Sequence, residues 1–380
     1  MPNEEVTRTF GIEEEYLLLD AATGDPTDSA AELILATPEL GEQTEREYFS
    51  SQLETSTSIC HEADEAEASL SRFRSIVAQA ADRCGVVLAG TGLPATGGET
   101  VGTVTPKPRY RRIETEIRGV GAHQYLTGTH VHVAVPSSDA GVEVIARIAR
   151  WVPALLALTA NSPLWCGEPT GFASWRHIMA LTMPVAGFPQ TFADGAAYEQ
   201  AVARLIDSGV ILDTGLVSWV IRLSSHYPTV ELRIADSQLH AADAVAFAAL
   251  VRALVDRALS DFAAGIERPI VTPGLVNGAD WIAARNGLSS DLVDPVTAER
   301  LPAFEFIDRM LGTVEGELDY FGDRSRIDRY LKYLREQGTP ASRQLAAFGS
   351  GGVASLLSLY RESNDELSSP HDAKRESGAE

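Results

Sequence analysis

The amino-acid sequence predicts an α+β fold in which helices cover a β-sheet. Short runs in which apolar and polar residues alternate are interspersed irregularly with longer segments whose apolar residues recur at every third or fourth position. The composition, 44% hydrophobic and 22% charged over 380 residues, is typical of a globular protein with a substantial core. No linker clearly divides this pattern, so we expect a single domain over residues 1–361.

The predicted strands follow from alternation with a period of two. Val131 and Val133 alternate with polar residues in one run, and Val230, Leu232 and Ile234 do so in another. Strands are expected over residues 7–20, 48–59, 86–91, 129–135 and 229–235.

The predicted helices follow from apolar stripes. Leu70, Phe73 and Val77 lie on one face of the first helix, and acidic residues crowd its first turn, where they favour the helix dipole. Segments 94–108 and 161–173 are rich in turn-forming residues, and the polar segment 362–380 predicts a disordered tail. Helices are expected over residues 64–84, 138–159, 242–264, 297–320 and 324–336.

The net charge restricts the kinds of partner. There are 31 Lys and Arg against 53 Asp and Glu, a formal net charge of −22, which disfavours nucleic acids and anionic membranes as partners. A small anion such as ATP stays compatible, because arginines and metal ions can offset the charge locally. The three cysteines lie far apart, and we recognise neither a signal peptide nor a membrane span, so we expect a cytoplasmic protein.

Two glutamates share one face of the first predicted strand. In the run Gly11-Ile-Glu-Glu-Glu15, Glu13 and Glu15 point to one side and Glu14 to the other. Two neighbouring carboxylates repel each other unless a cation lies between them, and oxygen ligands suit Mg²⁺ or Mn²⁺. The alternative is an edge strand with a solvated acidic face.

Two other strands pair an acidic residue with a polar neighbour on the same face. Gln52 and Glu54 form one pair, for which a solvated polar face is an adequate explanation. Glu231 and Arg233 form the other, opposite the apolar face of their strand. They would form an ordinary ion pair, or place Glu231 on a metal and Arg233 on a transferring phosphoryl group.

Two histidines, His130 and His132, also share a strand face. This spacing suits metal ligation or phosphate binding, and the alternative is a pair of core histidines hydrogen-bonded by their neighbours.

Basic residues gather in two loops. Lys107, Arg109, Arg111 and Arg112 lie within six residues, and they form either a site for nucleotide phosphates or a counterweight to the acidic surface. Arg176 follows Trp175 in a later loop, where it would grip a substrate carboxylate or simply pack with aromatic residues.

Taken together, these motifs resemble the type 2 glutamate–cysteine ligase family of bacterial ATP-dependent carboxylate–amine ligases. They occur in the family's order and at similar spacing, over roughly residues 7–348. The matching motifs are Phe10-Gly-Ile-Glu-Glu-Glu15, Gln52-Leu-Glu54, Gly128-Thr-His-Val-His-Val133, Asn161-Ser-Pro163, Thr170-Gly-Phe-Ala-Ser174 with Arg176, Pro228-Thr-Val-Glu-Leu-Arg-Ile-Ala-Asp236, Trp281-Ile-Ala-Ala-Arg285-Asn-Gly-Leu288 and Gly338-Thr-Pro-Ala-Ser-Arg-Gln344.

The resemblance implies a glutamine-synthetase-like fold, a curved antiparallel sheet with metal ligands on its concave face and helices packed behind. It implies that residues 1–361 form one catalytic domain that binds ATP and Mg²⁺, with Mn²⁺ as a substitute. The metal ligands would be Glu13, Glu15, Glu54, His130 and Glu231. Catalysis would involve Arg233 and Arg176, and the nucleotide would contact Lys107, Arg109, Arg233 and His132.

The activity implied by the resemblance is the activation of a carboxylate, such as the γ-carboxylate of glutamate, as an acyl phosphate that then reacts with an amine such as cysteine. Glutamate–cysteine ligation itself is expected to be weak, and the substrates to be small amino acids. The resemblance also suggests a homodimer or larger homo-oligomer. Three alternatives stay open: a guanidino-kinase-like phosphotransferase, an ATP-independent metal-dependent hydrolase or oxygenase centred on His130 and His132, and a binding protein that has lost catalytic activity.

Overall fold

A sheet of seven antiparallel strands forms the centre of the computed structural model, which describes residues 8–364 and residue 371. Its strands are β1 (Phe10–Asp20), β2 (Thr44–Arg46), β3 (Gln52–Ser56), β4 (Val86–Ala89), β5 (Gly128–Ala134), β8 (Ile221–Leu223) and β9 (Thr229–Asp236). Their order is β2-β3-β1-β5-β9-β8, and β4 pairs with the end of β1. Two short hairpins lie outside this sheet: β6 (Leu164–Trp165) with β7 (Glu168–Pro169), and β10 (Asp291–Val293) with β11 (Arg300–Pro302).

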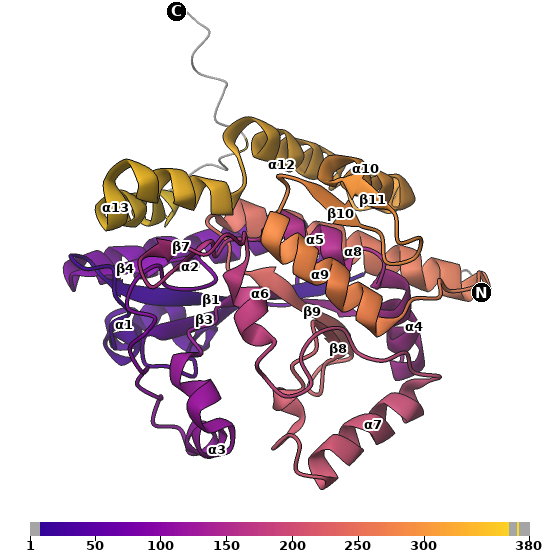
Figure 1. Cartoon of the computed structure of the whole chain (residues 1–380), viewed down its shortest axis with the longest axis horizontal. Coiled ribbons are helices and arrows are strands. Elements are labelled where there is room, and N and C mark those ends of the chain that lie inside the picture. Colours follow the sequence, from indigo (N-terminus) through magenta and orange to yellow (C-terminus); the bar gives the residue numbers. More distant parts are fainter. Residues whose placement is uncertain (1–7, 365–370, 372–380) are drawn as a thin grey trace, which may run out of the picture.

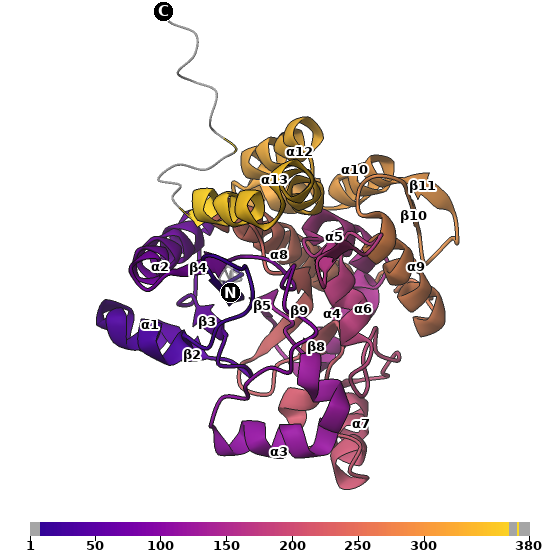
Figure 2. The same cartoon turned by 60° about the vertical axis from the view of Figure 1, so that its left-hand side comes forward.

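Helices lie on both sides of the sheet. They are α1 (Ala30–Ala36), α2 (Ala63–Arg83), α3 (Pro108–Ile117), α4 (Ser138–Ile148), α5 (Val152–Thr159), α6 (Trp175–Ala180), α7 (Gly195–Asp207), α8 (Ala241–Ala263), α9 (Pro273–Asn286), α10 (Ala303–Thr313), α11 (Glu315–Tyr320), α12 (Arg324–Gln337) and α13 (Pro340–Asn364). Figures 1 and 2 show α8, α12 and α13 on one side and α3 and α7 on the other. The predicted α+β class is confirmed. Among the described residues, no helix combines the length and the apolar character that a membrane span requires.

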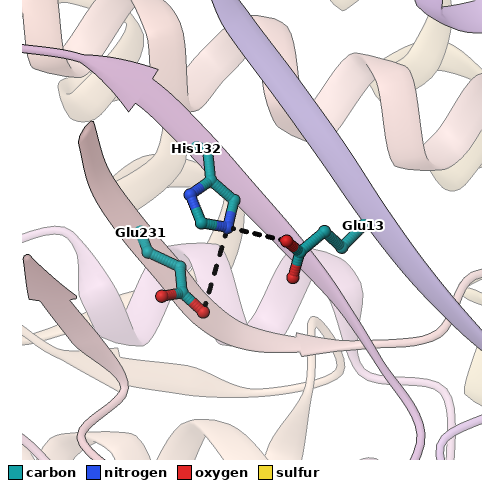
Figure 3. Close-up of side chains that lie close together, drawn as sticks. All are labelled: Glu13, His132 and Glu231. Atoms are coloured by element: carbon teal, nitrogen blue, oxygen red, sulfur yellow. Dashed lines mark ion pairs between the residues drawn. The ribbon is translucent and has the colours of Figure 1, made fainter. Parts of the chain in front are cut away.

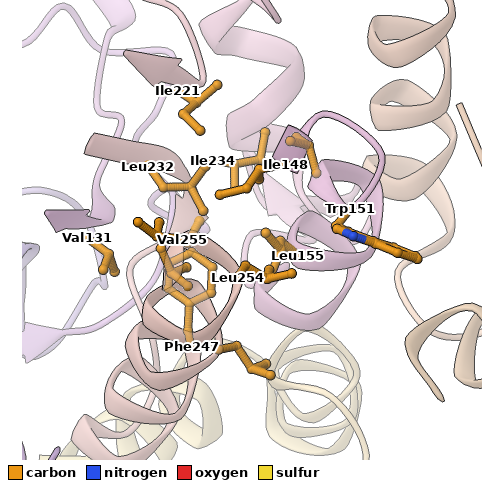
Figure 4. Close-up of a cluster of buried hydrophobic side chains, with 14 of the residues drawn as sticks. Val131, Ile148, Trp151, Leu155, Ile221, Leu232, Ile234, Phe247, Leu254 and Val255 are labelled. Atoms are coloured by element: carbon orange, nitrogen blue, oxygen red, sulfur yellow. The ribbon is translucent and has the colours of Figure 1, made fainter. Parts of the chain in front are cut away.

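The apolar side chains of the central strands point into one large core. Val131 of β5 and Leu232 and Ile234 of β9 are buried there, as the alternation predicts. Leu155 of α5 and Phe247 of α8 belong to the same core (Figure 4). Because apolar side chains fill this face, the polar residues that alternate with them point to the opposite face.

Glu14 departs from this apolar pattern because its carboxylate points into the layer between the sheet and the helices. It is completely buried and accepts hydrogen bonds from Arg74 of α2 at 2.8 Å and from the Tyr16 hydroxyl at 2.5 Å. Arg74 also donates to the carbonyl oxygens of Gln238 and Leu239, at 2.9 and 2.5 Å. This ion pair therefore joins β1, α2 and the segment that follows β9.

Most predicted elements are present, but two predicted helices are interrupted. Residues 138–159 form α4 and α5, because Pro153 has no N–H to donate to the Ala149 carbonyl of a continuous helix. Residues 297–320 contain β11 and then α10 and α11, because Pro302 disfavours helical backbone in the residue before it. Of the strand predicted at residues 48–59, the part from Gln52 to Ser56 forms strand β3.

Other differences concern segments whose residue patterns are less regular. The basic residues expected in a loop lie mostly on α3, which begins at Pro108 with the proline in its first turn. The residue pattern does not predict helices α1, α6, α7, α9 and α13, and Arg176, expected in a loop, lies on α6. The predicted tail at 362–380 starts too early, since α13 continues to Asn364; apart from residue 371, the rest of that tail lies outside the described residues.

We expect Arg74→Ala to lower the free energy of unfolding by about 3–5 kcal/mol, because the Glu14 carboxylate would stay buried without its counter-charge. Arg361→Ala is the control: it removes an exposed ion pair with Asp82 and should cost at most about 1 kcal/mol. Urea unfolding followed by circular dichroism measures both. Equal losses would contradict a structural role for the buried pair.

Candidate active site

The strand register brings the predicted acidic residues together on the face opposite the core. Glu15 lies opposite Glu54 of β3, and Glu13 lies opposite His130 of β5. Glu13 and Glu15 share this face, as predicted. Because β1 lies between β3 and β5, the alternative of an acidic edge strand is wrong.

Three carboxylates on this face, those of Glu15, Glu47 and Glu54, disfavour one another's ionisation. Burial and the charge of Glu47 raise the pKa of Glu15 to about 7. Burial and the charges of Glu47 and Glu15 raise the pKa of Glu54 well above its usual range, and burial raises that of Glu47. Carboxylates in such a cluster favour a bound proton or a bound cation.

Glu47 was not anticipated from the sequence. It follows β2 and precedes β3, outside any strand, so alternation carries no signal for it. The Tyr110 hydroxyl of α3 donates to Glu47 Oε2 at 3.1 Å and orients the carboxylate. The sequence feature that could have indicated Glu47 is its position directly before Tyr48 and Phe49, two aromatic residues that are both buried.

Glu13, His132 and Glu231 form a second group, shown in Figure 3. One side-chain atom from each lies within 4.8 Å of the others. His132 Nε2 lies 3.3 Å from Glu13 Oε1 and 4.0 Å from Glu231 Oε1, and it is buried without a hydrogen-bond partner among the described residues. His132 Nδ1 lies 3.0 Å from the Thr229 hydroxyl, which fixes the ring. An imidazole nitrogen that lies between two carboxylates and has no hydrogen bond of its own fits a divalent cation.

His130, which the resemblance implied as the ligand beside Glu231, lies between Glu13 and Arg233. Its Nδ1 is 3.5 Å from Glu13 Oε2 and accepts a hydrogen bond from Arg233 at 3.3 Å. Because a guanidinium can only donate, this nitrogen carries no proton. Burial and the charge of Arg233 lower the pKa of His130 to about 4.

Two arginines hold the carboxylate of Glu231. Arg222 donates to its two oxygens at 2.6 and 3.1 Å, and Arg233 also donates to Oε1. Although burial raises the pKa of Glu231, the charges of Arg233 and Arg222 outweigh it and lower the pKa. The ordinary ion pair between Glu231 and Arg233, one of the two alternatives from the sequence, is therefore present. The same carboxylate also faces His132.

An open cleft with a volume of about 230 Å³ lies beside the acidic cluster. Glu15 and Glu47 line it together with three arginines, Arg109, Arg176 and Arg233. Another part of its wall is apolar and includes Ile113, Ile117, Met183, Leu216 and Trp219. Cations beside carboxylates suit an anionic ligand that binds together with divalent cations.

The remaining residues singled out from the sequence, Arg109, Lys107 and Gln52, have different contacts. Arg109 lines the cleft and donates to both carboxylate oxygens of Asp213, at 3.0 and 2.9 Å. Lys107 instead donates to the Arg46 carbonyl at 2.9 Å, at the start of α3. Gln52 is buried, lines the cleft and hydrogen-bonds to the Phe49 N–H and the Leu126 carbonyl.

Comparison with known proteins gives consistent matches. The sequence profile of glutamate–cysteine ligase family 2 (GCS2) matches residues 9–366. A Saccharopolyspora erythraea protein with the provisional name glutamate–cysteine ligase 2-2 is 38% identical over 357 residues, covering 92% of this chain and 91% of that protein. A Nocardia farcinica protein provisionally named glutamate–cysteine ligase 2-1 is 37% identical, covering 97% of each.

A solved structure shares the fold. The glutamate–cysteine ligase of Francisella tularensis, crystallised with AMP, superposes with a TM-score of 0.66 at 13% identity, covering 97% of this chain and 90% of that one. The profile match and the sequence relatives together show that the chain belongs to glutamate–cysteine ligase family 2.

Proposed function

We propose that this protein, a ligase that forms carbon–nitrogen bonds, uses ATP to activate a carboxylate as an acyl phosphate and joins it to an amine. The observation that carries the proposal is the cleft in which the carboxylates of Glu15 and Glu47 face three arginines, next to the possible metal ligands Glu13, His132 and Glu231. The names of the relatives suggest glutamate as the acid and cysteine as the amine. A cytoplasmic location stays a prediction from the sequence, and a homodimer or larger assembly stays a prediction from the resemblance.

The donor atoms on the sheet fit hard divalent cations, because most of them are carboxylate oxygens, which favour Mg²⁺ or Mn²⁺. Cations held by these residues would offset the negative charge of the ATP phosphates. His130 also contacts Glu13 and stays a predicted ligand. We assign one cation to Glu13, His132 and Glu231 and another to Glu15, Glu47 and Glu54.

The arginines of the cleft would bind the reacting groups. Arg233 would donate to the transferring phosphoryl group and Arg176 to a carboxylate of the acid. The acid attacks the γ-phosphorus and ADP leaves; the amine then attacks the acyl carbon and phosphate leaves, with loss of the amine proton. Because water would hydrolyse the acyl phosphate, the apolar wall at Leu216 and Trp219 would protect it.

Phosphate release from ATP with Mg²⁺, measured with single amino acids and then with pairs, tests this function. We expect release to require an acid, with glutamate tested first, and to increase with an amine such as cysteine, with the amide identified by mass spectrometry. Phosphorylation of a guanidino compound without an amine would favour the phosphotransferase instead. No ATP turnover, together with tight Zn²⁺ or Fe²⁺ binding, would favour the hydrolase or oxygenase.

Glu54→Gln should reduce acid-dependent ATP turnover at least about 100-fold, because it removes a cation ligand. The same change should raise the thermal stability of the cation-free protein, because it relieves repulsion from Glu15 and Glu47. Glu45→Gln is the matched control: Glu45 lies opposite Glu54 in the sheet, but it is largely exposed and should leave both properties nearly unchanged. Full turnover in Glu54→Gln would refute the assignment.

The cation-free protein should lose stability as the pH rises through the interval from 4.5 to about 7. In this interval folded Glu15 keeps its proton while the unfolded chain releases it, so raising the pH favours unfolding. Unfolding midpoints at about pH 5.5 and about pH 8, with EDTA or Mg²⁺, measure the effect, and Mg²⁺ should stabilise more at the higher pH. Glu15→Gln should flatten the dependence. An equal Mg²⁺ effect at both pH values would be evidence against this site.

A further inference from the structure

Asp236 is completely buried at the end of β9, and the proposed chemistry gives it no part. Its carboxylate accepts hydrogen bonds from the segment that leads into α6. The Asn161 N–H donates at 2.7 Å, the Ser162 hydroxyl at 2.7 Å and the Ser174 hydroxyl at 2.8 Å. Asp236 therefore fixes both ends of this segment.

Arg176 lies where this segment enters α6. Its main-chain N–H donates to the Ser162 hydroxyl at 3.0 Å, so the same serine connects Asp236 with the backbone of Arg176. The Arg176 side chain lines the cleft, and the residue is 8% exposed. It packs against Gly128, where a Cβ would lie only 2.3 Å from Nη2, so a larger residue there would displace the guanidinium.

The guanidinium of Arg176 keeps most of its hydrogen-bonding capacity unused. Nη1 lies 3.8 Å from Asp236 Oδ1, the contacts with two main-chain carbonyls of β9 are long at 3.5 Å, and Nε has no hydrogen-bond partner in the part of the chain that is described. Arg222, by contrast, donates to both oxygens of Glu231 at 2.6 and 3.1 Å. A buried cation with free donors at a cleft is suited to bind a carboxylate.

We propose that Asp236 is a positioning residue that holds Arg176 so that its free N–H groups bind a carboxylate of the acid substrate; this inference rests on the proposed ligase function. The oxygens of Asp236 are occupied by three other donors, so it supplies a counter-charge without consuming the N–H groups of Arg176. The other acidic neighbour of the guanidinium is Glu15. Without Asp236, Arg176 would be drawn toward Glu15 and away from the substrate.

Asp236→Asn tests this role, because it keeps the shape of the side chain and removes its charge. With saturating Mg-ATP and the acid that supports phosphate release, glutamate first, we expect KM for the acid to rise about tenfold or more, while KM for ATP changes less than about twofold. Arg176→Lys should also raise the acid KM. In the double variant the two effects should not add, because both act through one contact.

Asp294→Asn is the matched control. Asp294 is equally buried and pairs with Arg150 at 2.7 Å, but Arg150, unlike Arg176, does not line the cleft. This change should lower the thermal stability and leave both KM values unchanged. If Asp236→Asn does not fold, Ser174→Ala removes one donor to Asp236 and should raise the acid KM about threefold.

The outcomes separate the two proposals. Wild-type protein without acid-dependent ATP turnover would overturn the proposed function and this inference with it. Acid-dependent turnover in the wild type, combined with Asp236→Asn raising both KM values equally or neither, would overturn the positioning role alone. A selective increase in the acid KM, absent from Asp294→Asn, would support it.

Discussion

Repulsion among carboxylates on one face of the sheet is the constraint on which the rest of this structure depends. Glu15, Glu47 and Glu54 lie in a cluster that resists full ionisation without a cation. Such a face keeps its shape only if other interactions hold the strands together. The opposite face provides them, through the apolar core and the buried pair of Glu14 with Arg74. The stability of the protein and its proposed chemistry therefore reside on opposite sides of the same strands.

Much of this division could be predicted from the sequence, because strand alternation has a period of exactly two residues. That period alone placed Glu13 and Glu15 on one face and Glu14 on the other. The alignment of neighbouring strands could not be predicted in this way. Register depends on turns and on packing between residues that lie far apart in the sequence. The family resemblance implied that Glu54 is a metal ligand together with Glu13 and Glu15, which periodicity could not indicate, and the strand register places Glu54 opposite Glu15.

Other parts of the site depend on tertiary structure. Glu47 reaches the acidic cluster from outside any strand, and Arg109 finds Asp213 more than a hundred residues away in sequence. The register between β5 and β9 shifts at Thr129–Val131, next to His130, so spacing alone could not decide which histidine meets Glu231. The position of Asp236 at the end of a motif was the available sequence feature for this residue, because the groups that hydrogen-bond to it belong to a separate segment.

The three successive glutamates of β1 have a consequence for how this protein tolerates change. A substitution alters one side chain, but an insertion or deletion just before Glu13 would exchange the two faces of the strand. Glu14 would enter the cleft, while Glu13 and Glu15 would be forced among apolar side chains. Because the three residues are all glutamate, such a change would hardly alter the composition of the strand, although it would severely disrupt the structure. Length variation among functional relatives should therefore be confined to the loops that flank β1.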